Sequence, residues 1–593
     1  MSHVFHIPVL GLAFSIDTPV KVARYGISSV VSIVDDILIE RMREYYSRKI
    51  GEEFVPINKQ EPDFRARRIT AYLNLLQQIV RSQFKNLRES DFVEGTEITK
   101  YFELLPDHSE LKQQYLQMLL MTDAREKAAI QKILKSKIRC GEIDVNIMSK
   151  VDKVNYETNG KSLGDQFTDA VAAVRGFAQS DLESSIILSA GMNPRLYSSL
   201  ETYPDFYPDK QGRLKKRIIL KVSDFRSALI QAKFLAKKGL WVSEFRIESG
   251  LNCGGHAFAT EGLLLGPILE EFKQKRTELL YTVFDMYQSS LKAKGLYVSA
   301  IPEMRVTVQG GIGTAEENSF LLEHFKLDGT GWGSPFLLVP EATNVDETTL
   351  DKLIIAEQSD FYISGSSPLG VPFNNFRGSS AELLRLERIK KGRPGSPCKK
   401  KYLVSNTEFT DKPICTASRE YQSLKLKELD KQESLSSAAY KKEFDRITEK
   451  VCLCEGLATS VYIKNGLLKP REERAVSICP GPNIAYFSGK YSLQEMVNHI
   501  YGKGSLLKSV NRPNIFVNEL KLYVEYLQKD IQQHITQLSD KKDKYFARFR
   551  SQLQEGIEYY KSLIPFISNE TETYKKRMLL DIQQLERNLA ELI

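Results

Sequence analysis

The sequence predicts an α/β fold: a (β/α)₈ TIM barrel with a helical insertion and a C-terminal extension of mixed and helical character. Three observations predict it. Short apolar segments rich in β-branched residues alternate with segments whose apolar residues recur at helical spacing. Eight such strand candidates occur before residue 350, and the last two end in glycine-rich turns. A doubly wound open sheet has the same alternation, so spacing alone leaves it as the alternative.

The strand candidates follow one another along the chain, and the first pair already forms a β-α-β unit. Thr18-Pro19 opens the helix between them, because proline suits the first turn of a helix. Helical patterns over 224–238 and 262–291 separate later strands. The predicted strands are 7–14, 27–34, 143–147, 185–189, 217–222, 243–248, 305–309 and about 328–333.

The other segments are predicted to be additions to this barrel, which takes residues 1–60 and 137–350. Residues 61–136 repeat apolar residues at helical spacing, so we expect an insertion of two to four helices. In residues 351–510 the alternation of strand and helix patterns stops, and Gly and Pro turns occur. We therefore expect an irregular extension or lid that carries cysteines. Residues 511–593 have apolar stripes typical of a helical hairpin packed on the body, with a homodimer seam as the alternative.

Composition argues against several classes of protein. The 593 residues are 42% hydrophobic and 27% charged, which is ordinary for a soluble globular protein. No run reaches the roughly 18 apolar residues of a membrane helix, and the N-terminus has no secretory signal pattern. The net charge of +8 is spread along the chain, with only short basic runs such as 399–401. We therefore expect a cytoplasmic protein with no nucleic-acid or membrane partner.

The seven cysteines, an odd number without a secretory signal, predict reduced thiols. Cys452 and Cys454 are separated by one residue, which is an uncommon spacing for zinc ligands. Iron–sulfur motifs place their cysteines closer together along the chain than the late cysteines lie here. We expect buried small thiols, with a reactive thiol or a metal site as alternatives. Cys253 is the thiol expected nearest to the barrel mouth. The late cysteines are Cys398, Cys415, Cys452, Cys454 and Cys479.

Two glycine-rich strand ends predict a phosphate site. Gly310 and Gly311 end the seventh strand and precede a helix, whose first amides favour an anion. Gly331, Gly333 and Ser334 end the eighth strand, and Ser334 adds a hydroxyl. Each segment alone is more often a plain turn. Together they occupy the two loops that commonly bind phosphate in such barrels.

A histidine follows the sixth strand in the segment from Glu248 to His256. This segment lies at the carboxyl face of the predicted barrel, where the chemistry of such folds occurs. A lone histidine is usually structural, but His256 follows two glycines in a loop and not an apolar helix face. An imidazole there could give or take a proton near neutral pH. His256 is therefore the candidate catalytic residue.

This set of motifs resembles the nitronate monooxygenase (2-nitropropane dioxygenase-like) family of FMN-dependent barrels, which also contains flavin enoyl-ACP reductases. The resemblance covers roughly residues 5–345, interrupted by the insertion, and implies an FMN-dependent oxidoreductase with His256 as its base. The matching segments are Ile7–Phe14, Val145–Ile147, Gly254–His256, Gly310–Ile312 and Gly331–Ser334. The residues implied to bind FMN are Asn146, Ser249, Gly254, Gly310, Gly311, Gly331, Gly333 and Ser334.

The departures from the family affect the reaction more than the cofactor. Ser249 stands where the family has Gln, Asn252 replaces an acidic residue, and Cys253 replaces Ala. Ser334 replaces Thr and keeps the hydroxyl. The resemblance implies nitronate oxidation with O₂. One alternative is an enoyl reductase that uses NAD(P)H on acyl chains, with an acyl carrier or synthase as partner. A second is a non-redox barrel that binds another phosphorylated ligand.

Overall fold

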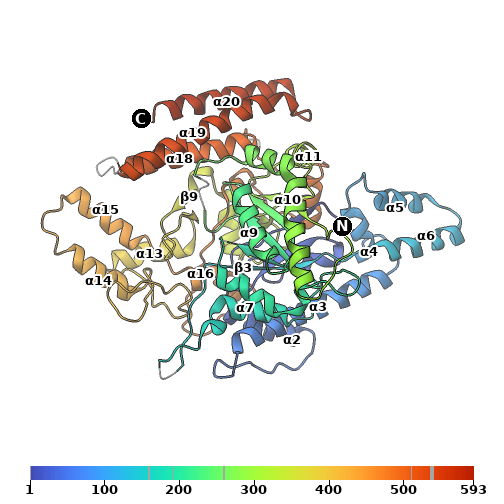
Figure 1. Cartoon of the computed structure of the whole chain (residues 1–593), viewed down its shortest axis with the longest axis horizontal. Helices are drawn as coiled ribbons and strands as arrows, with labels where there is room; N and C mark the ends of the chain where they lie inside the picture. The colour runs from blue at the N-terminus through green and yellow to red at the C-terminus, as the bar shows by residue number, and fades with distance from the viewer. Residues whose placement is uncertain are drawn as a thin grey trace.

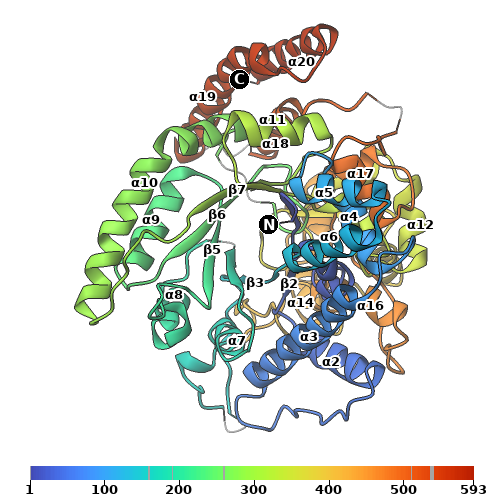
Figure 2. The same cartoon turned by 90° about the vertical axis from the view of Figure 1, so that its right-hand side faces the viewer.

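The computed structural model describes residues 2–157, 160–189, 191–257, 261–508, 511–534 and 540–592. Eight parallel strands close into a barrel in chain order, which confirms the predicted fold and excludes an open doubly wound sheet (Figure 2). The barrel strands are β1 Phe5–Ile7, β2 Ser28–Ser32, β3 Ile143–Met148, β4 Ser185–Ser189, β5 Arg217–Val222, β6 Val242–Glu248, β7 Arg305–Gln309 and β8 Gly329–Gly331.

Helices surround this barrel, because a parallel sheet has to be covered on its outer face. The helices between the strands, apart from the last three of the insertion, are α1 Thr18–Val22, α2 Asp36–Lys49, α3 Phe64–Glu89, α7 Asp169–Ala178, α8 Pro194–Ser199, α9 Phe225–Ala236, α10 Leu265–Ala293 and α11 Ala315–His324. Within the predicted insertion, 61–136, α3 is followed by α4 Glu97–Leu104, α5 Glu110–Leu120 and α6 Ala124–Lys137.

The chain after β8 builds a second group of elements. They are α12 Glu347–Ile355, β9 Phe361–Ser364, β10 Phe373–Phe376, α13 Ser380–Lys390, α14 Arg419–Leu429, α15 Ser437–Thr448, α16 Leu453–Lys464, α17 Leu493–Ile500, α18 Ile515–His534, α19 Asp540–Leu563 and α20 Glu572–Ala590. In residues 351–510, expected to be irregular, helices α13 to α17 and the β9–β10 pair alternate with loops as long as 391–418.

Seven of the eight strands lie where the sequence predicts them, within a few residues at each end. The first prediction, 7–14, is wrong, because β1 ends at Ile7 and a turn follows. Pro8 has no amide to donate to a neighbouring strand, and Gly11 has a φ of 54°. The Leu10 amide donates to the Ser15 hydroxyl instead of to another strand.

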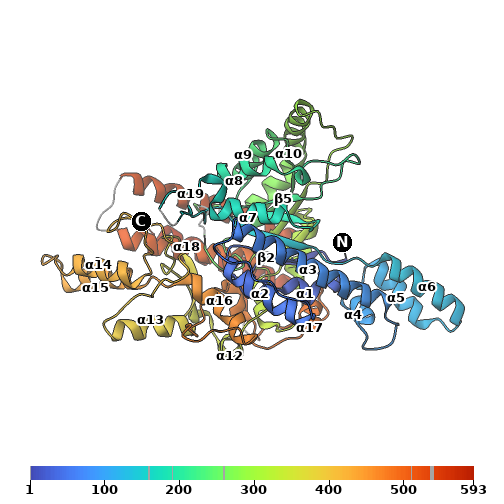
Figure 3. The same ribbon diagram turned by 90° about the horizontal axis from the view of Figure 1, so that it is seen from below.

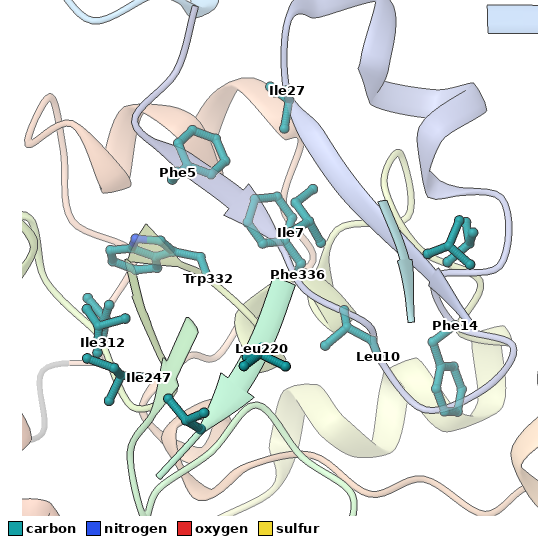
Figure 4. Close-up of a cluster of buried hydrophobic side chains, with 14 of the residues drawn as sticks. Phe5, Ile7, Leu10, Phe14, Ile27, Leu220, Ile247, Ile312, Trp332 and Phe336 are labelled. Atoms are coloured by element: carbon teal, nitrogen blue, oxygen red, sulfur yellow. The ribbon is translucent and has the colours of Figure 1, made fainter. Parts of the chain in front are cut away.

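The outer face of the barrel carries the hydrophobic core, whereas the inner face is largely polar. Side chains on the outer face pack with those of the helices and of the strand-end loops. Figure 4 shows Phe5 and Ile7 of β1 near Trp332 and Phe336, and the Phe5 and Phe336 rings stack with centroids 6.2 Å apart. The alternate residues of β6, Glu244, Arg246 and Glu248, point inward. Their inner position matters for the site described below.

The insertion and the extension project on opposite sides of the barrel. Helices α5 and α6 extend from one side, and α14 and α15 from the other (Figures 1 and 3). The C-terminal segment forms three helices, of which α18 and α19 pack against α10 with buried side chains such as Phe549 and Leu553. Among the described helices, none combines the length and apolar character that a membrane crossing requires.

Candidate active site

The two glycine-rich loops meet on the loop that follows β6. A Cβ atom on Gly311 would lie 2.5 Å from Leu251, and one on Gly333 would lie 2.6 Å from Cys253. The Ser249 hydroxyl also donates to the Gly310 carbonyl at 2.8 Å. Only glycine permits this close approach, so the loops after β6, β7 and β8 form one continuous surface at the carboxyl end of the barrel.

The carbonyls of the turn after β7 are held by side chains of the C-terminal extension. Arg512 donates to the Gly311 carbonyl at 2.6 Å, and the Asn483 amide donates to the Ile312 carbonyl at 2.7 Å. His499 lies 3.0 Å from the carbonyl oxygen of Gly313. The extension therefore fixes the orientation of this turn from the side opposite to its amides.

Several buried residues in these loops have amides for which no hydrogen bond is found within the described part of the chain. They include Gly311, Ile312, Gly333 and Ser334. A buried amide without an acceptor is uncommon in folded proteins, and each one costs free energy unless a ligand or water accepts from it. Amides that line a glycine turn at a helix start form an anion site. The loops thus retain donors suited to a phosphate.

A buried ion pair lies beside this turn. The Glu317 carboxylate accepts from the Gly313 and Ile515 amides at 2.9 and 2.7 Å, and Arg512 contacts it at 2.6 Å. Both charged side chains are almost fully buried. Because the guanidinium balances the carboxylate, an anion on the adjacent amides would not face an unpaired negative charge.

The Ser334 hydroxyl, expected to donate to a ligand, donates instead within the chain. It donates to the Cys253 carbonyl at 2.9 Å and accepts from the Gly481 amide at 2.7 Å. The Gly255 amide donates to the Cys479 carbonyl at 2.9 Å, and a Cβ on Gly254 would lie 2.2 Å from that oxygen. Residues 479–481 therefore cover part of the predicted phosphate surface.

A polar layer lies inside the barrel just below this surface. Lys221 of β5 pairs with Glu248 of β6 at 2.7 Å, and the Gln309 amide of β7 donates to Glu248 at 2.8 Å. A Cβ atom on Gly331 would lie 2.6 Å from Gln309 and 2.8 Å from His6, so glycine at this position leaves these side chains room. Neither Glu248 nor Gln309 was among the predicted site residues. The signal for Glu248 was the charged residue at every second position of β6.

Asn146 of β3 belongs to the same inner face. Its strand register pairs it with Ser32 and Ile187, which face the interior. Asn146 is only 4% exposed and lies on the inner face among these residues, so the position predicted for Asn146 suits a cofactor contact.

His256 lies at the edge of this layer. Its Nε2 is 2.8 Å from the Ser367 hydroxyl, and its ring contacts Phe373 edge-on with centroids 5.1 Å apart. Burial, and then the nearby positive charge of Lys221, lower the pKa of His256 to about 4. The imidazole is therefore neutral at physiological pH. Burial raises the pKa of the neighbouring Cys253 thiol, so Cys253 stays protonated.

A charged cavity of about 80 Å³ opens at the opposite, amino-terminal end of the barrel. Its lining includes His6, Asp144, Glu244 and Arg246, with Arg246 2.8 Å from Glu244 and 3.5 Å from Asp144. Chemistry in such barrels occurs at the carboxyl end, where the strand-end loops meet. We therefore take the mouth, and not this basal cavity, as the candidate active site.

Glu519 of α18 connects the extension to the loop that carries His256. Its carboxylate accepts from the Gly250 and Leu265 amides at 2.7 Å each, and from Tyr560 at 3.1 Å. Burial raises the pKa of Glu519 to about 7 in spite of these donors. The folded-state pKa lies above the unfolded value near 4.5, so this group's contribution to stability is full below pH 4.5 and is lost as pH rises through 7.

We expect Glu519→Gln to remove a pH dependence of stability. Between pH 5 and 8 the wild-type unfolding free energy should fall relative to the variant by up to about 3 kcal/mol, since one pKa unit corresponds to about 1.4 kcal/mol. Urea unfolding across this range measures the difference. Glu525→Gln, on the exposed face of the same helix, should keep the wild-type slope. Parallel curves for wild type and Glu519→Gln would refute the assignment.

Comparisons with known proteins give a distant likeness in structure only. No protein-family model and no curated protein matches the chain. It is similar to the enoyl reductase domain of MlnA from the macrolactin biosynthesis cluster of Bacillus amyloliquefaciens, with 14% identity and a TM-score of 0.33 over 76% of this chain and 95% of that one. FabK from Thermotoga maritima has 12% identity and a TM-score of 0.30, over 70% of this chain and 86% of that one. Nitroalkane oxidase from Streptomyces ansochromogenes has 12% identity and a TM-score of 0.25, over 58% of this chain and 88% of that one.

Proposed function

We propose that this chain is an FMN-dependent oxidoreductase of the nitronate monooxygenase-like type. The observation that carries the proposal is the set of amides without an acceptor in the described part of the chain, among them those of Gly311, Ile312 and Gly333, at the ends of β7 and β8. They are donors without acceptors in the place where barrels hold phosphate. The phosphate of FMN supplies acceptor oxygens of the required charge.

The residues of the mouth fit the rest of the cofactor. Asn146 is a buried amide side chain on the inner face of the barrel, and Lys221, Glu248 and Gln309 form a hydrogen-bonded polar group on the same face. FMN, when bound, supplies two-electron redox chemistry that no side chain provides. The chain then has to bind the substrate, exclude water and control one proton.

His256 is suited to control the proton, and Lys221 is suited to stabilise an anionic substrate. The neutral imidazole can accept a proton, and the Ser367 hydroxyl, 2.8 Å from Nε2, holds the ring in place. The Lys221 ammonium places a positive charge near the ring of His256. A positive charge at the mouth stabilises an anion there, whether a nitronate or the enolate that develops when an enoyl thioester is reduced. The charge of Lys221 would stabilise either anion, so it does not distinguish between the two substrate classes.

The absorbance spectrum of the purified protein tests the cofactor. We expect the two visible bands of oxidised flavin, present as purified or after addition of FMN. A protein that stays colourless in excess FMN would overturn the proposal and favour a barrel that binds another phosphorylated ligand. Aerobic oxidation of a nitronate without pyridine nucleotide would support the monooxygenase type. Anaerobic consumption of NAD(P)H with an enoyl thioester would identify the reductase instead.

Gly311→Asp should weaken FMN binding at least about tenfold, because a carboxylate placed beside the phosphate repels it. Fluorescence titration of the apoprotein with FMN measures the dissociation constant. Gly311 has a φ of 81° and lies against Leu251, so Gly311→Ala is the control for backbone strain and crowding. Equal affinities for the Asp and Ala variants would show that no phosphate lies at this turn.

A further inference from the structure

The loop that carries His256 is attached along one edge of the hairpin formed by β9 and β10. The two strands of the hairpin pair antiparallel, and His256 bridges β10 in the same sense. The Ala257 amide donates to the Pro372 carbonyl at 2.8 Å. The Asn374 amide of β10 donates to the Gly255 carbonyl at 2.9 Å. The candidate catalytic residue therefore stands on backbone that the hairpin holds.

The turn that leads to His256 has backbone conformations that need support from outside. Asn252 has a φ of 33°, and Gly254 and Gly255 have φ values of 117° and 82°. A residue with a side chain seldom adopts a positive φ, and such a conformation persists where the surrounding contacts impose it. The extension supplies contacts of this kind through the side chain of Asn374.

Asn374 joins both ends of this turn. Its side-chain amide donates to Oδ1 of Asn252 at 3.0 Å and to the Gly255 carbonyl at 3.1 Å. The same Oδ1 accepts from the Gly254 amide at 2.7 Å. A carbonyl can only accept and a backbone amide can only donate, so these two backbone groups fix the orientation of both side-chain amides. Asn252 and Asn374 are both buried, and we call them the asparagine pair.

The asparagine pair also contacts the glycine turn after β7. A Cβ atom on Gly310 would lie 2.7 Å from the Cα atom of Asn252, so this turn packs directly on the backbone of Asn252. The Asn252 side chain donates to the His256 carbonyl at 3.4 Å. Asn252 thus lies between the predicted phosphate turn and the candidate base, and Asn374 holds it from the extension.

The hairpin that supplies this support is itself fixed by the chain that follows it. The Glu449 carboxylate accepts from the Gly365 amide at 2.7 Å, and the Val451 amide donates to the Ser366 carbonyl at 3.0 Å. The next residue, Ser367, brings its hydroxyl to 2.8 Å from Nε2 of the imidazole. A group that transfers protons has to be held by residues that are themselves locked in place, and the hairpin meets this requirement.

We propose that Asn374 is a positioning residue of the candidate active site. It ties the strained turn 252–255 to the hairpin and so fixes the imidazole of His256 relative to the glycine turn after β7. The inference rests on the proposed function, because it assigns His256 a part in turnover. An error of about 1 Å in the placement of such a group can cost about 10²-fold in rate.

Asn374→Ala removes both side-chain donors and leaves the backbone amide bonded to Gly255. With a nitronate or an enoyl thioester, whichever is turned over, kcat should fall at least about tenfold, while KM and the dissociation constant of FMN change less than about threefold. Asn374→Asp should lower kcat further, because it places a carboxylate oxygen against the Gly255 carbonyl and against Oδ1 of Asn252.

Two measurements report the position of the loop without turnover. NMR titration of the His256 ring should give a pKa of about 4 in the wild type, with the signal assigned by its loss in His256→Ala. In Asn374→Ala this pKa should rise toward its ordinary value, because a looser loop admits water to the imidazole. Hydrogen exchange of the Gly255 and Ala257 amides should become faster, since the contacts that close this segment are weakened.

Asn375→Ala is the matched control, because Asn375 is the next residue of β10 and its side chain donates to the Tyr362 hydroxyl at 3.0 Å, away from the turn. This variant should keep the wild-type kcat, His256 pKa and exchange rates. Equal changes in both variants, or wild-type values in Asn374→Ala and Asn374→Asp, would overturn the inference. A protein that stays colourless in excess FMN, but whose Asn374→Ala variant shows the raised pKa and faster exchange, would refute the cofactor alone. Circular dichroism checks the folding of each variant.

Discussion

Arg512→Met should lower the free energy of unfolding by about 3–5 kcal/mol, the range for breaking a buried ion pair by removing one partner. Methionine fills much of the same volume, so the loss comes from charge and hydrogen bonding. The Glu317 carboxylate would stay buried without its guanidinium partner. The Gly311 carbonyl and the Asn483 side chain would also lose their donor. Urea unfolding measures the shift in midpoint and slope.

Two comparisons isolate the buried charge as the cause. Arg548→Met removes an ion pair with Glu261 whose side chains are 64% and 54% exposed, and it should change stability by less than about 1 kcal/mol. Adding Glu317→Gln to Arg512→Met removes the unpaired charge and should restore part of the loss. Equal effects of Arg512→Met and Arg548→Met would contradict the role given to this pair. The variant should also bind FMN more weakly, because the turn loses an anchor.

The strands could be predicted because their cause is local. A parallel barrel buries the outer face of every strand under helices, so each strand shows as a short apolar run, as in 185–189 and 217–222. The prediction failed at β1, where Pro8 and Gly11 interrupt an apolar run that continues as a buried turn. Hydrophobicity gave the burial of residues 8–14 correctly, but it does not distinguish a buried strand from a buried turn.

The glycine loops could be predicted from strand order, but their anchors could not. Gly310 and Gly311 stand at the end of a recognisable strand. Arg512, Asn483 and His499 lie about 170–200 residues further along the chain, and nothing in their local sequence points to the carbonyls they bind. Such contacts depend on how the extension folds back on the barrel, which has no local periodic signal.

The polar interior of the barrel could have been predicted from the sequence. In β6, Glu244, Arg246 and Glu248 alternate with Phe245 and Ile247. Because helices cover the outside of a parallel barrel, the apolar set has to face outward and the charged set inward. That argument predicts a charged interior and assigns Glu248 to the mouth, since it is the last residue of its strand.

His256→Ala should slow turnover by about 10²–10⁴-fold, the usual contribution of a positioned acid–base group, while FMN stays bound. The substitution removes the imidazole but touches neither the amides after β7 nor those after β8. Steady-state kinetics with the substrate class found by the spectral experiment measure turnover, and the flavin spectrum reports occupancy. His324→Ala, on α11 with its ring stacked on Phe320, should retain wild-type rates.

The pH profile distinguishes a base at the mouth from a merely structural histidine. With a pKa of about 4 in the folded enzyme, His256 is neutral above pH 5, so kcat/KM should be level there and should fall only in more acidic solution. Lys221→Met removes the nearby positive charge that helps to lower the pKa of His256. In this variant the acid limb should move to higher pH, and the rate should fall because an anion at the mouth loses its counter-charge. An acid limb that stays in place in Lys221→Met would mean that the group titrating in catalysis is not His256.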